Sequence, residues 1–369
     1  MGRKQSPLEN MEIMFWRNKR VFLTGHTGFK GGWLAHWLNI LGADICGFAL
    51  APDTQPNFFD LTRLEKNIKH LVGDIRDYDL LKKSIMDFKP DIIVHMAAQP
   101  LVIRSYANPL ETFSTNIMGT ANLLEAARLS QSTQVVLVIT TDKCYENNNA
   151  QQPFCEGDRL GGHDPYSNSK ACAELVTQSF RVSFYEKQNI GLATARAGNV
   201  IGGGDWSEHR LIPDMIRAIA DKKKLTLRYP DAIRPWQHVL ESLSGYLRLI
   251  EKCFSKPKKY SAAWNFGPKD LQHYSVKSIV EKFHEKINRD FNVEITENPK
   301  NEKLIESQHL TLNINKSLSE LNWSPYYTTE QSIEKTAEWY NAWFNHRDMA
   351  AITRDQILDY QNKLSREKL

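Results

Sequence analysis

The sequence predicts an α/β protein in which helices cover both faces of a doubly wound parallel sheet, with a smaller mixed lobe after it. Two observations carry this prediction. Short apolar segments alternate with helix-like segments over nearly two hundred residues. A glycine-rich turn, residues 24–31, joins the first apolar segment to the first helix-like one. With 369 residues, the chain has room for one large or two medium domains.

The expected elements follow from the periodicity of the apolar residues. Strands are expected at residues 21–23, 45–50, 70–72, 91–95, 135–140 and 190–196, and helices at 32–41, 77–88, 109–129 and 166–187. Asp77 is the expected N-cap of the second helix. After residue 196 the alternation weakens, and turn-rich segments surround two helical stretches, 276–289 and 329–345.

This pattern divides the chain into two parts. We expect residues 18–200 to form the first domain and residues 201–350 mainly a smaller lobe, with part of 236–265 returning to the first domain. Residues 1–15 are polar and lack the apolar segment of a signal peptide, so they are expected to fray. The charged residues after 350 are expected to form a terminal helix or to stay loose.

Composition excludes several classes of function. The 47 basic and 43 acidic residues give a net charge of +4, which is too balanced to predict binding to nucleic acid or to a membrane surface. No apolar run reaches the length of a transmembrane helix. The five cysteines are odd in number and none forms a Cys-x-x-Cys pair. The sequence therefore predicts no disulfide framework and no metal site, and a cytoplasmic location is the simplest expectation.

The glycine-rich turn is the first candidate site. Leu34, Trp37, Leu38 and Leu41 follow it at the spacing i, i+3, i+4 and i+7, which indicates a helix. Glycines permit a tight turn and a close approach of phosphate to the backbone, and a helix N-terminus offers free N–H groups. A strand before the turn and a helix after it strengthen the prediction of a dinucleotide site over an ordinary loop.

The second candidate site is a phenol and an ammonium group four residues apart. Tyr166 and Lys170 lie on one face of the helix expected at 166–187. A nearby ammonium group favours phenolate, so we expect it to lower the pKa of Tyr166 toward neutrality and make the phenol usable in acid–base chemistry. Taken alone, this spacing is also common on exposed helices.

Together the two motifs resemble the extended short-chain dehydrogenase/reductase family, with Thr-Gly-x-x-Gly-x-x-Gly at residues 24–31 and Tyr-x-x-x-Lys at 166–170. The resemblance implies a Rossmann-like fold, NAD bound by the first domain, substrate bound mainly by the smaller lobe, and a homodimer built from the helices at 109–129 and 166–187. The cofactor-binding residues that it implies are Thr24, Gly25, His26, Gly28, Phe29, Lys30, Gly31, Asp74, Ile75, Ala97, Ala98, Gln99, Asn116, Thr140, Tyr166 and Lys170.

Two departures from the family pattern concern the cofactor. His26 adds bulk within the glycine turn, near the expected pyrophosphate, and is expected to weaken or reshape binding. The acid that usually follows the second strand is missing, since Asp53 comes slightly late. The preference for NAD over NADP therefore rests mainly on the resemblance.

The segment after the fifth strand narrows the resemblance. Thr141-Asp142-Lys143 stands where sugar-nucleotide 4,6-dehydratases commonly carry Thr-Asp-Glu. Together with residues 202–206 and 234–239, it resembles the branch of the CDP-glucose 4,6-dehydratases. This resemblance implies a nucleotide-sugar substrate and an NAD that is reduced and reoxidised within each turnover.

In such a reaction Tyr166 takes the proton of the C4 hydroxyl while NAD takes the hydride. Asp142 serves as the acid that helps the C6 hydroxyl to leave, provided that burial raises its pKa. Thr141 assists Tyr166. We hypothesise that Lys143 is the base at C5 when neutral, or that it stabilises the enolate when charged.

Substrate contacts are expected mainly from arginines, because their forks suit a pyrophosphate. Arg234 is the leading candidate; Arg196, nearest the sheet, could equally form a structural salt bridge. The substrate-binding residues that the resemblance implies are Arg104, Asn199, Asp205, Arg210, Arg234 and His238.

Three other functions remain open on the sequence. An NAD-dependent sugar-nucleotide epimerase would keep Tyr166 and Lys170 but would not need the adjoining acid and base. A 4,6-dehydratase of another nucleotide sugar would share every motif. A dinucleotide-sensing regulator on the same fold could dispense with Tyr166 and Lys170.

Overall fold

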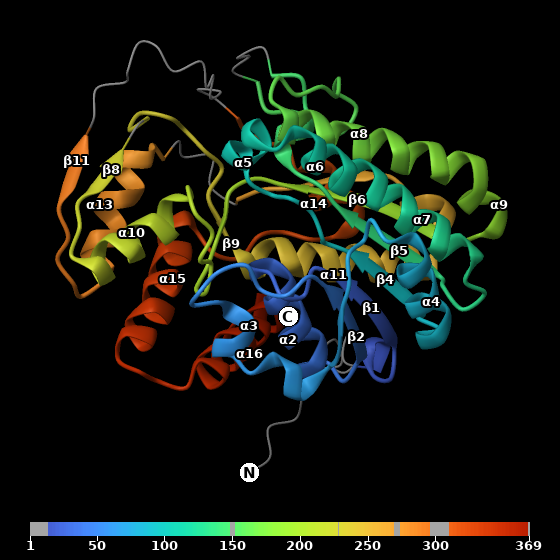
Figure 1. Cartoon of the computed structure of the whole chain (residues 1–369), viewed down its shortest axis with the longest axis horizontal. Helices are drawn as coiled ribbons and strands as arrows, with labels where there is room; N and C mark the ends of the chain where they lie inside the picture. Colours follow the sequence, from blue (N-terminus) through green and yellow to red (C-terminus); the bar gives the residue numbers. More distant parts are fainter. Residues whose placement is uncertain (1–13, 148–151, 228, 269–273, 296–309, 368–369) are drawn as a thin grey trace.

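A computed structural model describes residues 14–147, 152–227, 229–268, 274–295 and 310–367. Most of the N-terminal segment that was expected to fray lies outside these residues. The centre of the molecule is a sheet of seven parallel strands in the order β10-β6-β5-β4-β1-β2-β3 (Figure 1). Its strands are β1 (Arg20–Thr24), β2 (Asp44–Ala49), β3 (Lys69–Val72), β4 (Ile92–His95), β5 (Val135–Ile139), β6 (Gly191–Ala197) and β10 (Ala263–Phe266). The predicted doubly wound parallel sheet is thus confirmed.

Strand residues alternate between two apolar cores, because successive side chains of a strand point to opposite faces. In β1, Val21 and Leu23 join one core, and Phe22 joins the other. Helices α2 (Phe29–Ile40), α11 (Val239–Ser255) and α16 (Met349–Glu367) contribute to the first core. Helices α4 (Tyr78–Phe88) and α7 (Gly119–Leu129) contribute to the second. Both faces of the sheet are therefore covered, which explains its nearly continuous apolar strands.

Most expected helices are present with small shifts of their ends. Asp77 accepts a hydrogen bond from the backbone N–H of Leu80 and so caps α4 as predicted. The helix expected at 109–129 is α6 (Pro109–Phe113), a π-helical turn and α7. The helix expected at 166–187 is α8 (Pro165–Phe180), a second π-helical turn and α9 (Glu186–Gln188). The residues after 350 form the long helix α16 rather than a loose tail.

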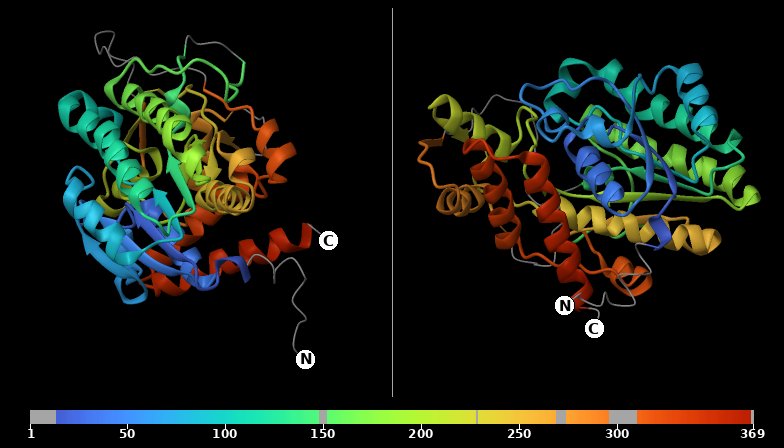
Figure 2. Two further views of the ribbon diagram at one scale, coloured as in Figure 1. Left: turned by 90° about the vertical axis from the view of Figure 1, so that its right-hand side faces the viewer. Right: turned by 90° about the horizontal axis from the view of Figure 1, so that it is seen from below.

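The smaller lobe lies at one side of the sheet, where β1, β5 and β6 have their carboxyl ends (Figures 1 and 2). It contains α10 (Leu211–Asp221), α13 (Val276–Lys286) and α15 (Thr329–Phe344), with the two-stranded sheets β8 (Leu225–Leu227) with β11 (Val293–Ile295) and β7 (Val200–Ile201) with β9 (Gln237–His238). The remaining short helices are α3 (Phe58–Leu61), α5 (Val102–Ala107), α12 (Pro257–Tyr260) and α14 (Asn315–Leu321). The chain returns from this lobe to the sheet through α11 and β10, and β10 pairs in parallel with β6.

Candidate active site

The glycine turn follows β1 directly and is packed too tightly for side chains at two positions. Gly25 has a φ of +78°, and a Cβ there would lie 2.7 Å from the backbone nitrogen of Ala97. A Cβ on Gly31 would lie 2.1 Å from the carbonyl oxygen of Gly25. Gly25 therefore needs glycine because of its positive φ and the backbone after β4, and Gly31 because the first turn of α2 rests directly on the loop.

The N-terminus of α2 is open to an anion. Gly28 is its N-cap, is exposed, and provides no side-chain hydrogen bond to the first turn. The first N–H groups of a helix have no intrahelical partner, and the helix dipole favours negative charge at this end. The turn therefore fits the pyrophosphate of a dinucleotide, as the sequence predicts.

Thr24 acts inside the loop rather than at its surface. Its side chain is fully buried, and its hydroxyl lies 2.8 Å from Nδ1 of His95. It also accepts hydrogen bonds from the backbone N–H groups of Met96 and Ala97, at 3.1 and 3.2 Å. Thr24 thus ties the end of β1 to the end of β4 and holds the two cofactor-side loops together.

His26 does not project over the glycine turn, contrary to its expected position near the pyrophosphate. Its ring is fully buried, lies against Phe59 and Gly47, and places Nε2 2.7 Å from Nδ1 of His70 on β3. Burial and the nearby His70 lower the pKa of His26 to about 3, so its ring is neutral at physiological pH. The ring of His26 therefore packs on the buried side of the glycine turn and holds the turn in place.

Gln99 and Asn116 are also used within the protein. The backbone N–H of Gln99 donates to Oδ1 of Asn116 at 2.8 Å, and the amide of Asn116 donates to Ser169 at 2.9 Å. The side-chain amide of Gln99 donates to Thr112. The structure therefore gives both side chains a positioning role behind the site, since the amide of Gln99 joins the loop after β4 to α6 and that of Asn116 reaches α8.

After β3, at the edge of the candidate site, Asp74 forms a bidentate pair with Arg76, and this guanidinium lowers the pKa of the carboxyl. Ile75 is buried, and its side chain fills the space beside Gly119. This rim follows β3, beside the end of β2. Asp53 is largely exposed there and lies 3.8 Å from Arg104.

Thr140 belongs to a buried ionic network rather than to a surface facing a cofactor. Its hydroxyl donates to Glu174 at 2.5 Å, and Arg196 makes a fork to the same carboxylate at 2.9 Å. Both charged side chains are only 3% exposed. The two alternatives for Arg196 are thereby resolved in favour of a structural ion pair. No short motif marks Glu174, which the sequence analysis missed.

Tyr166 and Lys170 stand on the first turns of α8, whose N-cap is Asp164. The structure contradicts the expectation that Lys170 lowers the tyrosine pKa. The ammonium group of Lys170 donates to the carbonyl of Ile139 at 3.1 Å. Burial raises the pKa of Tyr166 to about 12 and lowers that of Lys170 to about 8. The two groups share one buried region, but burial dominates both pKa values.

Thr141 stands between two of the predicted catalytic groups. Its hydroxyl donates to Oδ1 of Asp142 at 2.9 Å, and its polar side chain also lowers the pKa of the Tyr166 phenol. Asp142 is 2% exposed, and burial raises its pKa, as the acid role requires. Lys143, the next residue in the same short 3₁₀ turn, is half-buried and counteracts this rise. The predicted residues Thr141, Asp142 and Lys143 thus lie together at the end of β5.

A second lysine reaches the same region from the glycine turn. The amine of Lys30 donates to the phenol oxygen of Tyr246 on α11 at 3.0 Å. Burial, followed by the charges of Arg210 and Lys170, lowers its pKa to about 7, while Asp142 partly opposes this change. Tyr246 was missed because no local motif marks it, and Lys30 was expected only among the cofactor contacts.

The predicted substrate residues are not all in one place. Arg210 and Asp205 form an ion pair of 2.9 Å, and the charge of Arg210 also acts on Tyr166. Arg234 is buried, and its charge lowers the pKa of Asp142. Arg104 is half exposed on α5 and pairs with Glu111 at 2.9 Å.

Two further candidates have structural contacts. The carbonyl of Asn199 accepts a hydrogen bond from Gln237 in the link between β7 and β9. His238 is fully buried between Trp33 and Tyr327, and its Nδ1 caps α11 by accepting from the N–H of Leu240. The prediction of a substrate contact by His238 is therefore wrong, because packing aims the ring into the core.

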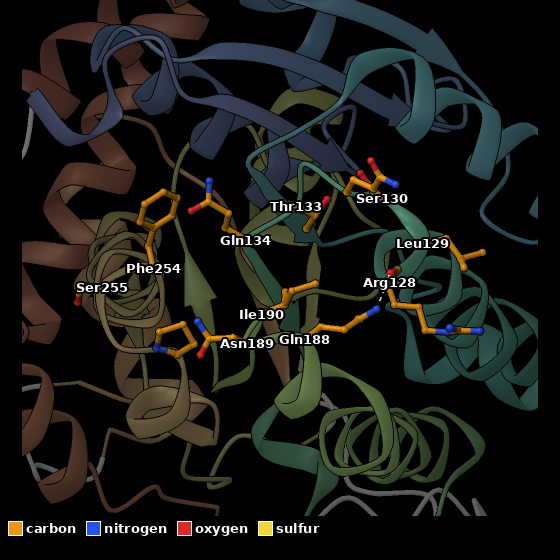
Figure 3. A pocket seen from close by; sticks show the side chains of 12 residues that line it. Arg128, Leu129, Ser130, Thr133, Gln134, Gln188, Asn189, Ile190, Phe254 and Ser255 are labelled. Atoms are coloured by element: carbon orange, nitrogen blue, oxygen red, sulfur yellow. Dashed lines mark hydrogen bonds between the residues drawn. The ribbon is translucent and has the colours of Figure 1, made fainter.

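One hollow lies away from this cluster, at the amino-terminal ends of β5 and β6 (Figure 3). It measures about 550 Å³ and is lined mainly by polar side chains such as Gln134, Gln188 and Asn189. Its one charged lining residue, Arg128, already pairs with Glu125. In parallel sheets ligands bind at the opposite, carboxyl edge, so we place no active site here.

The described part of the chain contains no group of three or more His, Cys, Asp or Glu side chains that could hold a metal ion. None of its helices combines the length and the apolar character needed to cross a bilayer.

Comparison with known sequences identifies relatives of the whole chain. A family profile described as GDP-mannose 4,6 dehydratase matches residues 22–336. A CDP-glucose 4,6-dehydratase of Salmonella typhimurium is 44% identical over 358 residues, which cover 95% of this chain and 99% of that protein. A human dTDP-D-glucose 4,6-dehydratase is 26% identical and covers 89% of this chain.

Solved structures agree on the fold. An epimerase of Methanothermobacter thermautotrophicus superposes with a TM-score of 0.78 at 22% identity, over 92% of this chain and 97% of that one. A dTDP-glucose 4,6-dehydratase of Bacillus anthracis in complex with NAD gives a TM-score of 0.73 at 22% identity, over 90% and 99% of the two chains.

Proposed function

Because the chain belongs to the GDP-mannose 4,6 dehydratase family, we propose that it is an NAD-dependent hydro-lyase that converts CDP-glucose to CDP-4-keto-6-deoxyglucose and water. The 44% identity to a CDP-glucose 4,6-dehydratase over nearly the full length of both chains supports this substrate. One observation carries the reaction type: the buried acid Asp142, hydrogen-bonded to Thr141 at 2.9 Å, lies close enough to Tyr166 for its charge to act on the pKa of the phenol. An epimerase needs no such acid beside its tyrosine.

Residues 18–200 are proposed to hold NAD and residues 201–350 mainly the nucleotide sugar. The open N-terminus of α2 supports a pyrophosphate position at Gly28 and Gly31, and Lys170 supports a place for the ribose and nicotinamide near Tyr166. Bound NAD supplies the chemistry of a hydride acceptor that becomes a hydride donor within the same turnover.

The protein groups would act in sequence on the sugar. Tyr166 in its phenolate form accepts the proton of the C4 hydroxyl as that carbon is oxidised to a ketone. The ketone acidifies the hydrogen at C5, which Lys143 removes if it is neutral, or which leaves an enolate that a charged Lys143 stabilises. Asp142 protonates the departing C6 hydroxyl, and its raised pKa suits that role. The proton at C5 is returned when C6 has received the hydride.

The nucleotide would be held by cations around this cluster. Arg210 and Arg234 are the proposed partners of the diphosphate, since both have guanidinium charges that act on the catalytic groups. Arg104, Asn199 and Asp205 are proposed to contact the sugar or the nucleotide from the rim of the site.

The proposal is tested by incubating the purified protein with NAD and one nucleotide sugar at a time. The sugars are the CDP, dTDP, UDP and GDP derivatives of glucose and the corresponding derivatives of mannose. The 4-keto-6-deoxy product absorbs in alkali, and mass spectrometry detects the loss of water. We expect turnover of the CDP sugar. Turnover of only another nucleotide would reject the CDP assignment, and a C4 epimer without loss of water would reject the dehydratase.

Assembly and location are proposed on other grounds. Large apolar side chains are exposed on the neighbouring helices α6–α7 and α8–α9, namely Leu110, Met118, Leu175, Val182 and Phe184. Such a patch is typical of a protein interface, so we propose a homodimer that pairs these helices with their copies. We further propose that the dimer works in the cytoplasm, where nucleotide sugars and reduced cysteines are expected.

A further inference from the structure

The carboxyl group of Asp142 has one oxygen with a hydrogen-bond partner and one without. Its Oδ1 accepts the hydroxyl proton of Thr141 at 2.9 Å. Its Oδ2 is buried and makes no hydrogen bond with any residue that the structure describes. An ionised oxygen buried in this way is unfavourable, and burial therefore favours the protonated carboxyl. Oδ2 is thus the oxygen suited to carry the proton that the proposed reaction delivers to the C6 hydroxyl.

Gly198, the residue directly after β6, lies against this oxygen. A Cβ added to Gly198 would lie 2.8 Å from Oδ2 of Asp142 and 2.4 Å from Cγ of Pro235. Non-bonded carbon atoms normally approach one another only to about 3.5–4.0 Å, so both distances are too short for a side chain. The carboxyl group and the proline ring therefore occupy the space that any larger residue at position 198 would need.

Backbone pairing keeps Pro235 beside Gly198. The N–H of Gln237 donates to the carbonyl oxygen of Asn199 at 3.0 Å, and β7 then pairs in parallel with β9. The chain that follows Gly198 is thus held to the chain that follows Pro235. The proline ring cannot rotate away from an added Cβ, whereas the carboxyl of Asp142 can move about its side-chain bonds. A side chain at residue 198 would therefore displace the carboxyl group.

The turn that carries Asp142 is also tied to the end of β6. Arg196, two residues before Gly198, donates to the phenol oxygen of Tyr145 at 2.8 Å, and Tyr145 directly follows the turn. The same guanidinium forms its fork to Glu174 on α8. The end of β6 therefore sets where the turn lies and how closely its carboxyl group can approach the strand.

We propose that Gly198 is a positioning residue for the loss of water, because the absence of a side chain lets the carboxyl of Asp142 lie against the end of β6 with Oδ2 available to the C6 oxygen of the sugar. This inference rests on the proposed dehydratase function. Oxidation at C4 depends instead on Tyr166 and NAD. Gly198 should therefore affect the second half of the reaction and leave the first half intact.

Other charges near Asp142 come from residues that remain unchanged when residue 198 is replaced. The ionisable groups that interact electrostatically with this carboxyl belong to its own turn, to the segment before β9 and to α2, α8 and α11; they are Lys143, Cys144, Arg234, Lys30, Tyr166 and Tyr246. A change in pH dependence that follows the side chain at residue 198 therefore reports on its contact with Oδ2.

The test places a side chain at residue 198 after making room for it. Pro235→Ala removes the nearer of the two obstructing atoms, and Gly198→Ala and Gly198→Ser are compared in this background, so that any effect of Pro235→Ala is common to all of them. Gly157→Ala in the same background is the matched control, because a Cβ there meets no atom within 4 Å. Circular dichroism and NAD titration establish that each protein is folded and binds the cofactor.

Each protein is mixed with stoichiometric NAD and CDP-glucose in a single turnover at a series of pH values. The absorbance of the reduced nicotinamide reports oxidation at C4, and mass spectrometry of quenched samples reports the loss of water. Gly198→Ala should slow the loss of water by about 10²-fold relative to oxidation, since a catalytic group misplaced by about 1 Å has an effect of this size. The reduced nicotinamide should therefore accumulate, while Gly157→Ala should keep the ratio of the background protein.

Gly198→Ser adds the same Cβ and a hydroxyl that can donate to Oδ2. Such a hydrogen bond stabilises the carboxylate and lowers the pKa of Asp142. Because Asp142 acts in its protonated form, the loss of water should decline at a lower pH in Gly198→Ser than in Gly198→Ala. Oxidation at C4 should have the same pH dependence in both variants.

Three results would overturn the proposed role of Gly198. In the first, Gly198→Ala keeps the ratio of the two steps. In the second, it slows oxidation and loss of water equally, which would assign the glycine to packing or to substrate binding. In the third, the Ala and Ser variants lose water with the same pH dependence, which would show that residue 198 does not contact the oxygen that carries the proton. Wild-type protein that never dehydrates CDP-glucose would instead reject the proposed function itself.

Discussion

Lys30 and Tyr246 join the glycine turn to α11, with the amine of Lys30 donating to the phenol oxygen at 3.0 Å. The two residues are 216 positions apart in the chain. Lys30 thus directs its amine into the region of Asp142 and Lys170, although it belongs to a motif that is read as a phosphate cradle. Because Lys30 is buried close to Arg210 and Lys170, its pKa is lowered, and the stability of the fold should depend on pH.

Replacing Lys30 by Met should stabilise the protein most at neutral pH. The folded-state pKa is lowered from 10.5 to about 7, so the unfolded chain binds more protons between these values and wild-type stability falls as pH falls through this window. The gain of Lys30→Met over wild type should therefore shrink as pH rises from 7 toward 10. Urea unfolding at a series of pH values measures it, and Lys66→Met at an exposed site is the control. An advantage independent of pH would contradict the burial argument.

His238→Asn should make the protein less sensitive to acid. Burial lowers the pKa of His238 from 6.5 to about 3, so the unfolded state binds more protons in this window and stability is lost as pH falls through it. Asn retains the N-cap of α11 without titrating. Thermal unfolding between pH 7 and 4 should show a smaller decline for His238→Asn than for wild type. The exposed His163→Asn should behave as wild type; equal slopes for all three proteins would refute the prediction.

Glu174→Gln should strongly destabilise the fold, because it leaves the charge of Arg196 buried without its partner. Breaking such a pair costs about 3–5 kcal/mol. The matched control is Glu125→Gln, which breaks a partly exposed pair with Arg128 and should cost less than about 1 kcal/mol. Denaturant unfolding measures both, and similar losses in the two variants would show that burial does not set the cost.

Lys143 variants should separate its two proposed roles. The rate at which the C5 hydrogen exchanges with deuterium from solvent, measured by mass spectrometry, reports the base. If Lys143 is the base, Lys143→Ala and Lys143→Arg should both lose about 10²-fold or more of this exchange. If it stabilises the enolate as a cation, Lys143→Arg should retain much of the rate. Normal exchange in Lys143→Ala would remove both roles.

Val182→Glu should dissociate the proposed dimer. Val182 is 58% exposed, in the π-helical turn that continues α8. A carboxylate there would be desolvated in the proposed interface, which is unfavourable without a partner. Sedimentation velocity should show a dimer for the wild type and monomers for Val182→Glu. Val293→Glu, at an exposed site on β11, is the control and should remain dimeric. A monomeric wild type would reject the dimer.

The sequence alone determined the parallel sheet, most helices and the catalytic motifs, because these depend on local spacing. Apolar periodicity separates strands from helices, and the glycines at 25 and 31 are required by contacts close in the chain or to the neighbouring β4 loop. The placement of Tyr166 and Asp142 at one edge also followed, since the carboxyl ends of parallel strands meet there.

Only the tertiary structure decided where several side chains point. His26 turns beneath its loop toward His70, His238 is held in the core, and Lys30 meets Tyr246 rather than a phosphate. Asp142 comes close enough to act on the pKa of Tyr166 because the turn after β5 packs against α8. Such contacts join residues far apart in the chain, and burial then sets their pKa values. Local periodicity predicts neither the long-range contacts nor the pKa values, because both depend on how distant parts of the chain pack together.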